Sequence, residues 1–153
     1  MKIIGTENLK ELLRFSPDPD RQTGDDRITL TVLDVLQIVG EGSISNDDSG
    51  SGDARRVKRP ARKSAMDPVG YWDLTQGPYW VTYNEMVQIP EGFTLVLQPH
   101  SGLLKNGLWH PTLVVRDWAE VSGMLLVISA RGARIMENAP LSTGFIIGSQ
   151  KKG

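Results

Sequence analysis

The sequence predicts a mainly β protein, a sandwich or barrel of short strands with one short helix near the N-terminus. Two observations support this fold class. After residue 68, short apolar or alternating runs recur between glycine, proline and asparagine signals, a spacing that is typical of sandwiches and barrels. No internal repeat of about 20–50 residues is visible, which disfavours a solenoid or propeller.

The expected elements begin with a helix over residues 7–15, where Thr6 offers an oxygen cap and three leucines recur at helical spacing. Two prolines then end this helix. The β-branched, nearly alternating residues 28–39 predict a strand with one buried face. Further strands are expected over residues 79–83, 86–89, 93–97, 112–115, 124–128 and 144–147.

Residues 43–68 interrupt this pattern. A stretch rich in glycine, serine and acid is followed by six basic residues between Arg55 and Lys63. Without apolar periodicity such a segment cannot bury enough surface to offset its ordering entropy, so we expect a mobile loop. Clustered cations attract nucleic acid or acidic partners, but most such runs are solvated, and we expect no nucleic-acid partner.

Composition limits the function. The chain has 153 residues, which fit a single domain over residues 1–153. Seventeen Lys and Arg against 18 Asp and Glu leave a net charge of -1, which excludes the global basic field of a dedicated nucleic-acid binder. The lack of cysteine excludes disulfide scaffolds, thiolate metal sites and cysteine nucleophiles. Because no run reaches signal-peptide or membrane length, we expect a cytoplasmic protein without membrane contact.

Two histidines, His100 and His110, lie near Asp117 and Glu120 in the sequence and suggest a metal site. Small-barrel metal sites usually draw alternating ligands from one strand face, whereas these histidines flank a glycine-bearing segment. We therefore expect polar loop histidines and no metal ligands. Asp117 directly follows an apolar strand, where a carboxylate either activates water or forms a turn.

Residues 99–107 read PHSGLLKNG. The hydroxyl of Ser101, the flexible Gly102 and the cation of Lys105 lie close together, a combination that can surround a phosphate. The same letters are typical of a helical turn that stops at the Asn-Gly pair. On these residues alone we favour the helical turn and keep the phosphate-binding segment as the alternative.

The order of these features resembles the deoxyuridine triphosphatase (dUTPase) and deoxycytidine triphosphate deaminase superfamily, above all its archaeal-type branch. The opening MKIIG with its short helix, the strand over residues 28–39 and the segment YWVTYNEMVQIP over residues 79–90 have counterparts there. Residues 99–107 match the family segment Pro-Arg-Ser-Ser-Leu-Leu-Arg-x-Gly. The resemblance covers nearly the whole chain and is weakest in the basic loop.

The resemblance implies a homotrimer of distorted jelly-roll subunits, each a dUTPase-type β-barrel. It places the deoxynucleotide triphosphate at subunit interfaces, where the phosphate segment of one chain faces Asp117 of a neighbour, with Mg²⁺ held largely by the triphosphate. Asp117 matches the catalytic aspartate that positions the attacking water. Thr143 falls in the family's Gly-x-x-Ile-Ala-Gln motif, which strand order places over residues 139–144. The implied nucleotide-binding residues are His100, Ser101, Gly102, Lys105 and Thr143.

The implied function is hydrolysis of dUTP to dUMP and pyrophosphate. The alternative is a catalytically degenerate trimeric nucleotide-binding or regulatory protein. This alternative is motivated by His100, Gly102 and Lys105, which replace an arginine, a serine and an arginine of the family's phosphate segment. It is also motivated by the family's Asp-x-Gly-Tyr-x-Gly, which has become DWAEVSG over residues 117–123. The deaminases carry a glutamate in the next strand, but residues 124–129 contain no carboxylate, which disfavours dCTP deamination.

Overall fold

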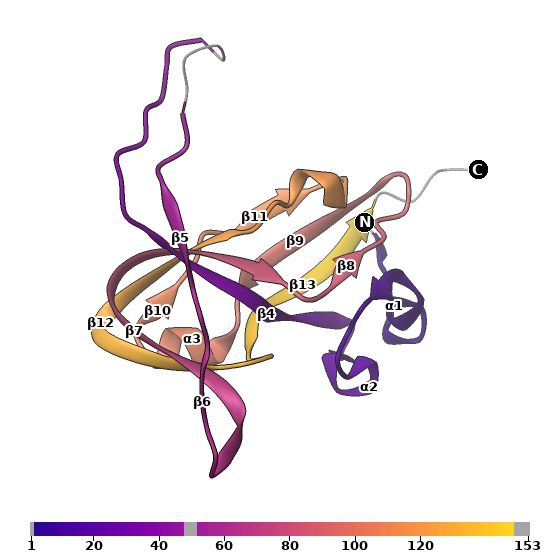
Figure 1. Cartoon of the computed structure of the whole chain (residues 1–153). Helices are drawn as coiled ribbons and strands as arrows, with labels where there is room; N and C mark the ends of the chain where they lie inside the picture. Colours follow the sequence, from indigo (N-terminus) through magenta and orange to yellow (C-terminus); the bar gives the residue numbers. More distant parts are fainter. Residues whose placement is uncertain (1, 48–51, 149–153) are drawn as a thin grey trace.

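The protein folds into a curled antiparallel sheet with short helices at its margins (Figure 1). The computed structural model describes residues 2–47 and 52–148. Along the curl the strand order is β10-β12-β7-β4-β13-β9-β11, with β1, β3, β5 and β6 paired beside it, and β2 and β8 form a separate ribbon. The bounds are β1 Lys2–Ile3, α1 Thr6–Leu12, β2 Leu13–Arg14, α2 Pro19–Gln22, β3 Thr23–Gly24, β4 Arg27–Ile38, β5 Arg56–Arg59, β6 Arg62–Ser64, β7 Asp67–Tyr83, β8 Met86–Val87, β9 Phe93–Pro99, α3 Ser101–Lys105, β10 Leu108–Trp109, β11 Leu113–Val115, the 3-10 helix η1 Trp118–Glu120, β12 Met124–Met136 and β13 Pro140–Gly148.

Strand β4 turns the sheet into a barrel-like shape because its two halves pair with different neighbours. The first half pairs with β13 from Ile28 to Thr31, and the second half pairs with β7 from Val32 to Gln37. The register shifts between Val32 and Val35, just after the change of partner. The predicted mainly β, barrel-like fold with a short N-terminal helix is confirmed.

The core lies between the two walls of this curl. Apolar side chains of β4, β9, β12 and β13 meet there and lose nearly all contact with water. Burying one such leucine or isoleucine contributes about 1.5–3 kcal/mol, so this cluster is a main source of stability. The side chains that expose 1% or less of their surface include Leu30, Leu95, Leu97, Leu126, Ile128 and Ile146.

The predicted helix is present but shorter, because strand pairing decides where it ends. α1 stops at Leu12, since Leu13 begins β2 and pairs with β8. Its N-cap is Gly5 rather than Thr6, and the Thr6 hydroxyl instead accepts a hydrogen bond from the Asp26 N–H at 2.9 Å. Within the described residues, no helix is long and apolar enough to cross a membrane.

Strands β7 and β12 extend well beyond the predicted runs. Their outer parts pair with each other on the far side of a register shift between Ile128 and Gly132. There Arg134 Nε donates to Asp73 Oδ1 at 2.8 Å, and its guanidinium lies 4.1 Å from the centre of the Tyr71 ring. Because charged and aromatic side chains replace the apolar alternation here, the sequence pattern gave no strand signal.

The segment predicted as a mobile loop is partly strand, and the prediction is wrong for β5 and β6. β5 pairs with β4, and β6 pairs with β7. Acidic neighbours offset part of the positive charge: Lys58 Nζ lies 3.1 Å from Asp34 Oδ1, and Lys63 Nζ lies 3.7 Å from Glu137 Oε1. The long neighbouring strands therefore supply the pairing that this segment lacks by itself. Residues 48–51, part of the same prediction, lie outside the described residues.

Candidate functional site

The segment singled out in the sequence forms the corner between β9 and α3. His100 caps α3, because its Nδ1 accepts the Gly102 N–H at 3.1 Å. The His100 backbone N–H donates to the Leu141 carbonyl at 2.9 Å and so joins this corner to β13. α3 ends at Lys105 with Asn106 as its C-cap, and Gly107 follows with a φ of 77°, a conformation that favours glycine. The predicted helical turn with an Asn-Gly stop is confirmed.

A cavity of about 380 Å³ lies between α2 and His100. We call it the α2 cavity. Its walls come from the N-terminal segment, from β4 and from the turn before β13, so residues more than 100 positions apart in the sequence meet in it. The lining residues are Pro17, Asp18, Arg21, Gln22, Thr29, Thr31, His100, Asn138 and Pro140.

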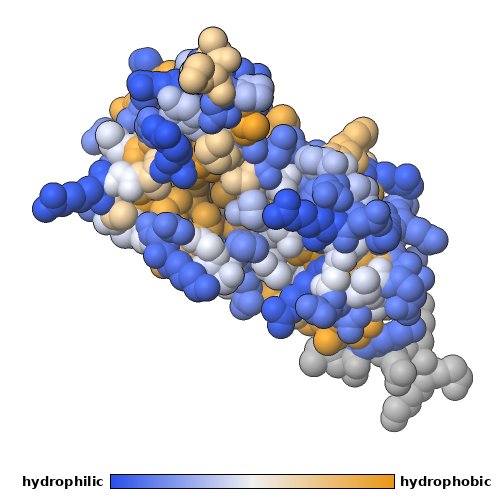
Figure 2. All heavy atoms as spheres, turned by 90° about the horizontal axis from the view of Figure 1, so that it is seen from below, coloured by the Kyte–Doolittle hydropathy of each residue, from blue (hydrophilic) through white to orange (hydrophobic). Residues whose placement is uncertain are grey.

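A second hollow, of about 530 Å³, opens between α3 and β12. Gly102 lines it together with apolar side chains such as Leu108 and Ile135. Seen from below, the molecule presents an apolar hollow bordered by hydrophilic side chains (Figure 2). Ser101 and Lys105 are exposed on α3 and are not among the described residues that line either cavity.

Asp117 lies on the loop between β11 and η1. Its Oδ1 accepts the Ala119 N–H at 3.0 Å and caps η1, and the residue is exposed. The next side chain, Trp118, turns inward, where its ring centroid lies 6.3 Å from that of Tyr83 at an angle of 50°. The neighbouring Arg116 lines a cavity of about 650 Å³ at the start of β9.

One chain does not bring Asp117 and His100 together. β11 runs antiparallel to β9 with Val115 opposite Leu95, whereas His100 follows the last residue of β9. At about 3.3 Å per residue along a strand, the two lie about 20 Å apart. Figure 1 shows η1 and α3 at opposite ends of β9. The sequence motifs therefore form two separate half-sites within one subunit.

A buried chain of hydrogen bonds joins Tyr83, Ser142 and His110. Tyr83 Oη lies 2.5 Å from Ser142 Oγ, which lies 2.8 Å from His110 Nε2. His110 Nδ1 lies 2.8 Å from the Pro111 carbonyl and donates to it, so Nε2 accepts from the Ser142 hydroxyl. Burial lowers the pKa of His110 and raises the pKa of Tyr83, because desolvation disfavours both charged forms. Neutral side chains thus connect the segment before β11 to β7 and β13.

Glu85 fixes α2 to β4 from inside the protein. It exposes only 3% of its surface. Its Oε1 accepts the Thr31 N–H at 2.7 Å, and its Oε2 accepts from Gln22 Nε2 at 2.8 Å and from Thr31 Oγ1 at 2.5 Å. Gln22 Nε2 also donates to the Thr29 carbonyl at 2.8 Å. Because Gln22, Thr29 and Thr31 all line the α2 cavity, this carboxylate holds its wall.

Thr143 is half-buried on β13, opposite Gln98 of β9 and Thr29 of β4. Among the described residues, it is not one that lines the α2 cavity or the apolar hollow. Of the predicted nucleotide-binding residues in the described part of the chain, only His100 and Gly102 line these two cavities: His100 lines both, and Gly102 lines the apolar hollow.

Two residues of the α2 cavity, Arg21 and Asn138, were not identified from the sequence. The Asp18-Pro19 pair is a helix-start signal and could have placed Arg21 on a short helix after the first one. Asn138 has a φ of 61°, and asparagine is among the few residues other than glycine that readily adopt this conformation. Neither signal indicates a shared cavity, because the cavity depends on the tertiary fold.

No family model matches the chain. A protein from Methanosarcina mazei named as a probable deoxyuridine 5'-triphosphate nucleotidohydrolase is 25% identical over 151 residues, which cover 91% of this chain and 84% of that protein. A protein of the same name from Methanosarcina acetivorans has the same identity and coverage. Among solved structures, the dUTPase of Staphylococcus bacteriophage 80alpha aligns with a TM-score of 0.44 and 15% identity, over 62% of this chain and 85% of that chain.

Proposed function

We propose, because the chain belongs to the dUTPase-like superfamily, that it hydrolyses dUTP to dUMP and pyrophosphate. The observation that carries this proposal is the similarity to archaeal probable dUTP nucleotidohydrolases over 91% of the chain. The mainly β, curled sheet supports it, since the resemblance to the superfamily implies a fold of this kind. In this proposal the half-site at Asp117 positions the attacking water, and the half-site at α3 binds the phosphates.

In this proposal Asp117 positions the attacking water. Its Oδ1 is held by the Ala119 N–H at 3.0 Å, which leaves Oδ2 on an exposed side chain to accept a hydrogen bond from water. On the phosphate side, the Ser101 hydroxyl and the Lys105 ammonium are both exposed on α3. They would donate to phosphate oxygens, and the charged Lys105 would give the stronger interaction.

A complete site in this proposal needs two subunits. Asp117 and Ser101 lie at opposite ends of β9, about 20 Å apart along the strand, which is too far for both to act on one phosphate group. A closed three-fold assembly would place the Asp117 loop of one chain against α3 of its neighbour. Light scattering at micromolar concentration should then give about three times the chain mass.

Magnesium would enter with the triphosphate. Among residues 2–47 and 52–148, no group of three or more histidine, aspartate or glutamate side chains is arranged to hold a metal ion. In this proposal Mg²⁺ is held mainly by the triphosphate of the substrate and neutralises part of its charge. A cytoplasmic location stays a prediction.

A catalytically degenerate nucleotide-binding protein of the same assembly is the second candidate. His100 uses Nδ1 to cap α3 and offers no guanidinium to a phosphate. Trp118 packs beside Tyr83 and so is turned away from a sugar that would approach the Asp117 loop. Both features favour weaker substrate contacts than the superfamily pattern implies.

The test is incubation of the purified protein with dUTP and Mg²⁺, with pyrophosphate release as the readout. We expect release by the native protein and none by Asp117→Asn. Asp25→Asn, a matched change at an exposed carboxylate in the turn before β4, should keep native activity. Absence of turnover together with tight dUTP binding by calorimetry would favour the degenerate protein, and absence of both would overturn the proposed function.

A further inference from the structure

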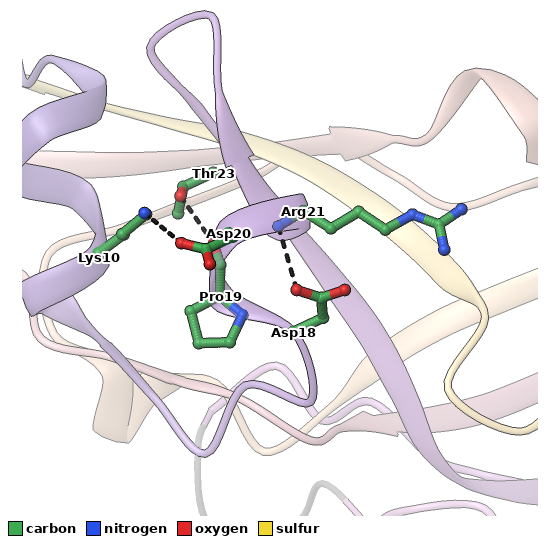
Figure 3. Close-up of polar contacts among 6 residues, drawn as sticks. All are labelled: Lys10, Asp18, Pro19, Asp20, Arg21 and Thr23. Carbon is green, nitrogen blue, oxygen red and sulfur yellow. Dashed lines mark hydrogen bonds and ion pairs between the residues drawn. The ribbon is translucent and has the colours of Figure 1, made fainter.

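The α2 cavity contains a cation that no carboxylate neutralises. Asp20 of α2 and the N-cap residue Asp18 flank Arg21, but neither carboxylate contacts its guanidinium (Figure 3). Asp20 pairs with Lys10, and Asp18 Oδ1 accepts the backbone N–H of Arg21 at 3.3 Å. The guanidinium of Arg21 extends away from both carboxylates (Figure 3). Within the described part of the chain, Arg21 has no side-chain hydrogen bond or ion pair, although it lines the α2 cavity.

The opposite wall of the α2 cavity offers further hydrogen-bond donors. Asn138 Oδ1 accepts from Asn84 Nδ2 at 2.9 Å, which directs the amide Nδ2 of Asn138 to other partners. His100 Nδ1 accepts the Gly102 N–H, so the proton of the neutral ring is on Nε2. Arg21, Asn138 and His100 therefore all present N–H groups, and among the described side chains those of Arg21 and Asn138 have donors left without a protein acceptor.

The cavity wall that carries Arg21 is fixed. Gln22, the next residue, donates to Glu85 and to the Thr29 carbonyl, both at 2.8 Å, and its Oε1 accepts from the Ser16 hydroxyl at 2.6 Å. These bonds hold the backbone of α2 against β4. Only the side chain of Arg21 has to be ordered when a ligand enters, which limits the entropic cost of binding.

We infer that Arg21 binds the oligophosphate of the substrate from the α2 cavity, beside the phosphate segment. A guanidinium can donate two parallel hydrogen bonds to a phosphate, which neither His100 nor Lys105 can do. A cavity of about 380 Å³ is within the size range of small-ligand sites. This inference rests on the proposed function for the identity of the anion as a nucleotide triphosphate. It makes Arg21 a substrate-binding residue contributed by a part of the chain outside the phosphate segment.

The test measures binding of inorganic tripolyphosphate and of dUTP by calorimetry. Arg21→Gln should weaken both at least about tenfold, because it removes a charge-assisted hydrogen bond, and should leave deoxyuridine binding unchanged. Arg21→Lys should recover part of the loss. Arg27→Gln is the matched control, because Arg27 is an exposed arginine nearby on β4, and it should stay within about twofold of the native protein.

A second variant, Asn138→Gly, keeps the backbone conformation accessible and removes the amide donor, and should weaken tripolyphosphate binding about threefold or more. The inference is overturned if the native protein does not bind tripolyphosphate, or if Arg21→Gln binds it as tightly as the native protein does. It is also overturned if Arg27→Gln loses as much affinity as Arg21→Gln. Binding that depends on Arg21 without dUTP hydrolysis would support this inference while the proposed hydrolysis failed.

Discussion

Replacing Glu85 by alanine should destabilise the protein strongly. Glu85 exposes only 3% of its surface, and its carboxylate accepts from Thr31 N, Thr31 Oγ1 and Gln22 Nε2 at 2.5–2.8 Å. Glu85→Ala leaves these donors without their acceptor. Each unsatisfied buried donor costs about 1–3 kcal/mol, and because neighbouring losses are not additive we expect about 3–5 kcal/mol in total.

The size of this loss can be measured by urea unfolding, followed by tryptophan fluorescence. At about 2–4 °C per kcal/mol for a chain of this size, the melting temperature should also fall by about 6–20 °C. Protein concentration has to be equal in all samples, because assembly adds to apparent stability. The stability of Glu85→Gln should lie between that of the native protein and that of Glu85→Ala, since its amide keeps one oxygen acceptor but turns an N–H toward a donor.

The control is Glu91→Ala, which removes an exposed carboxylate and should change the free energy of unfolding by less than about 0.5 kcal/mol. If the free energy of unfolding of Glu85→Ala lies within about 1 kcal/mol of that of the native protein, the bonds from Glu85 to α2 and β4 do not stabilise the fold to the expected extent.

The remaining predictions concern pH and backbone geometry. Burial lowers the pKa of His110, so the unfolded chain, whose histidine titrates near about pH 6.5, takes up a proton first as pH falls. Stability should therefore be full above about pH 6.5 and decline below it, and His110→Gln should flatten this part of the pH profile; equal slopes for both proteins would contradict the assignment. Gly123 has a φ of 155°, and a Cβ there would meet the Trp80 indole and the Val81 carbonyl, so Gly123→Ala should cost about 2–3 kcal/mol. Gly24→Ala, where a Cβ would meet nothing within 4 Å, should cost little, and similar melting temperatures for the two variants would refute the strain argument.

The strands of the core could be predicted because their apolar residues alternate or cluster. β5 could not, since its sequence Arg-Val-Lys-Arg has no buried face of its own and its backbone pairs with β4. The outer halves of β7 and β12 could not be predicted for the same reason. Charged residues such as Arg134 and Asp73 stand there in place of alternating apolar residues. Whether such a segment forms a strand depends on the neighbouring strand with which it pairs, and its own sequence does not reveal this.

The phosphate segment could be located because its residues are contiguous in the sequence. Only the structure shows that His100 caps α3 through its Nδ1. The α2 cavity could not be predicted in the same way. Arg21 and Asn138 are far apart in the sequence and meet only because β4 and β13 pair. The free amide of Asn138 depends further on its bond to Asn84. Which N–H donors remain free in the cavity therefore depends on the tertiary structure and not on a sequence motif.

The central claim, a hydrolytic site shared between subunits, is tested most directly by mixing two inactive variants. Asp117→Asn loses the water-positioning half, and the double variant Ser101→Ala, Lys105→Ala loses the phosphate-binding half, so each alone should be inactive. Co-expression in equal amounts should restore about a quarter of native dUTP hydrolysis, because random closed assembly joins two intact halves in about one interface of four. Mixed assemblies no more active than the two variants alone, or a monomer that hydrolyses dUTP, would contradict the account.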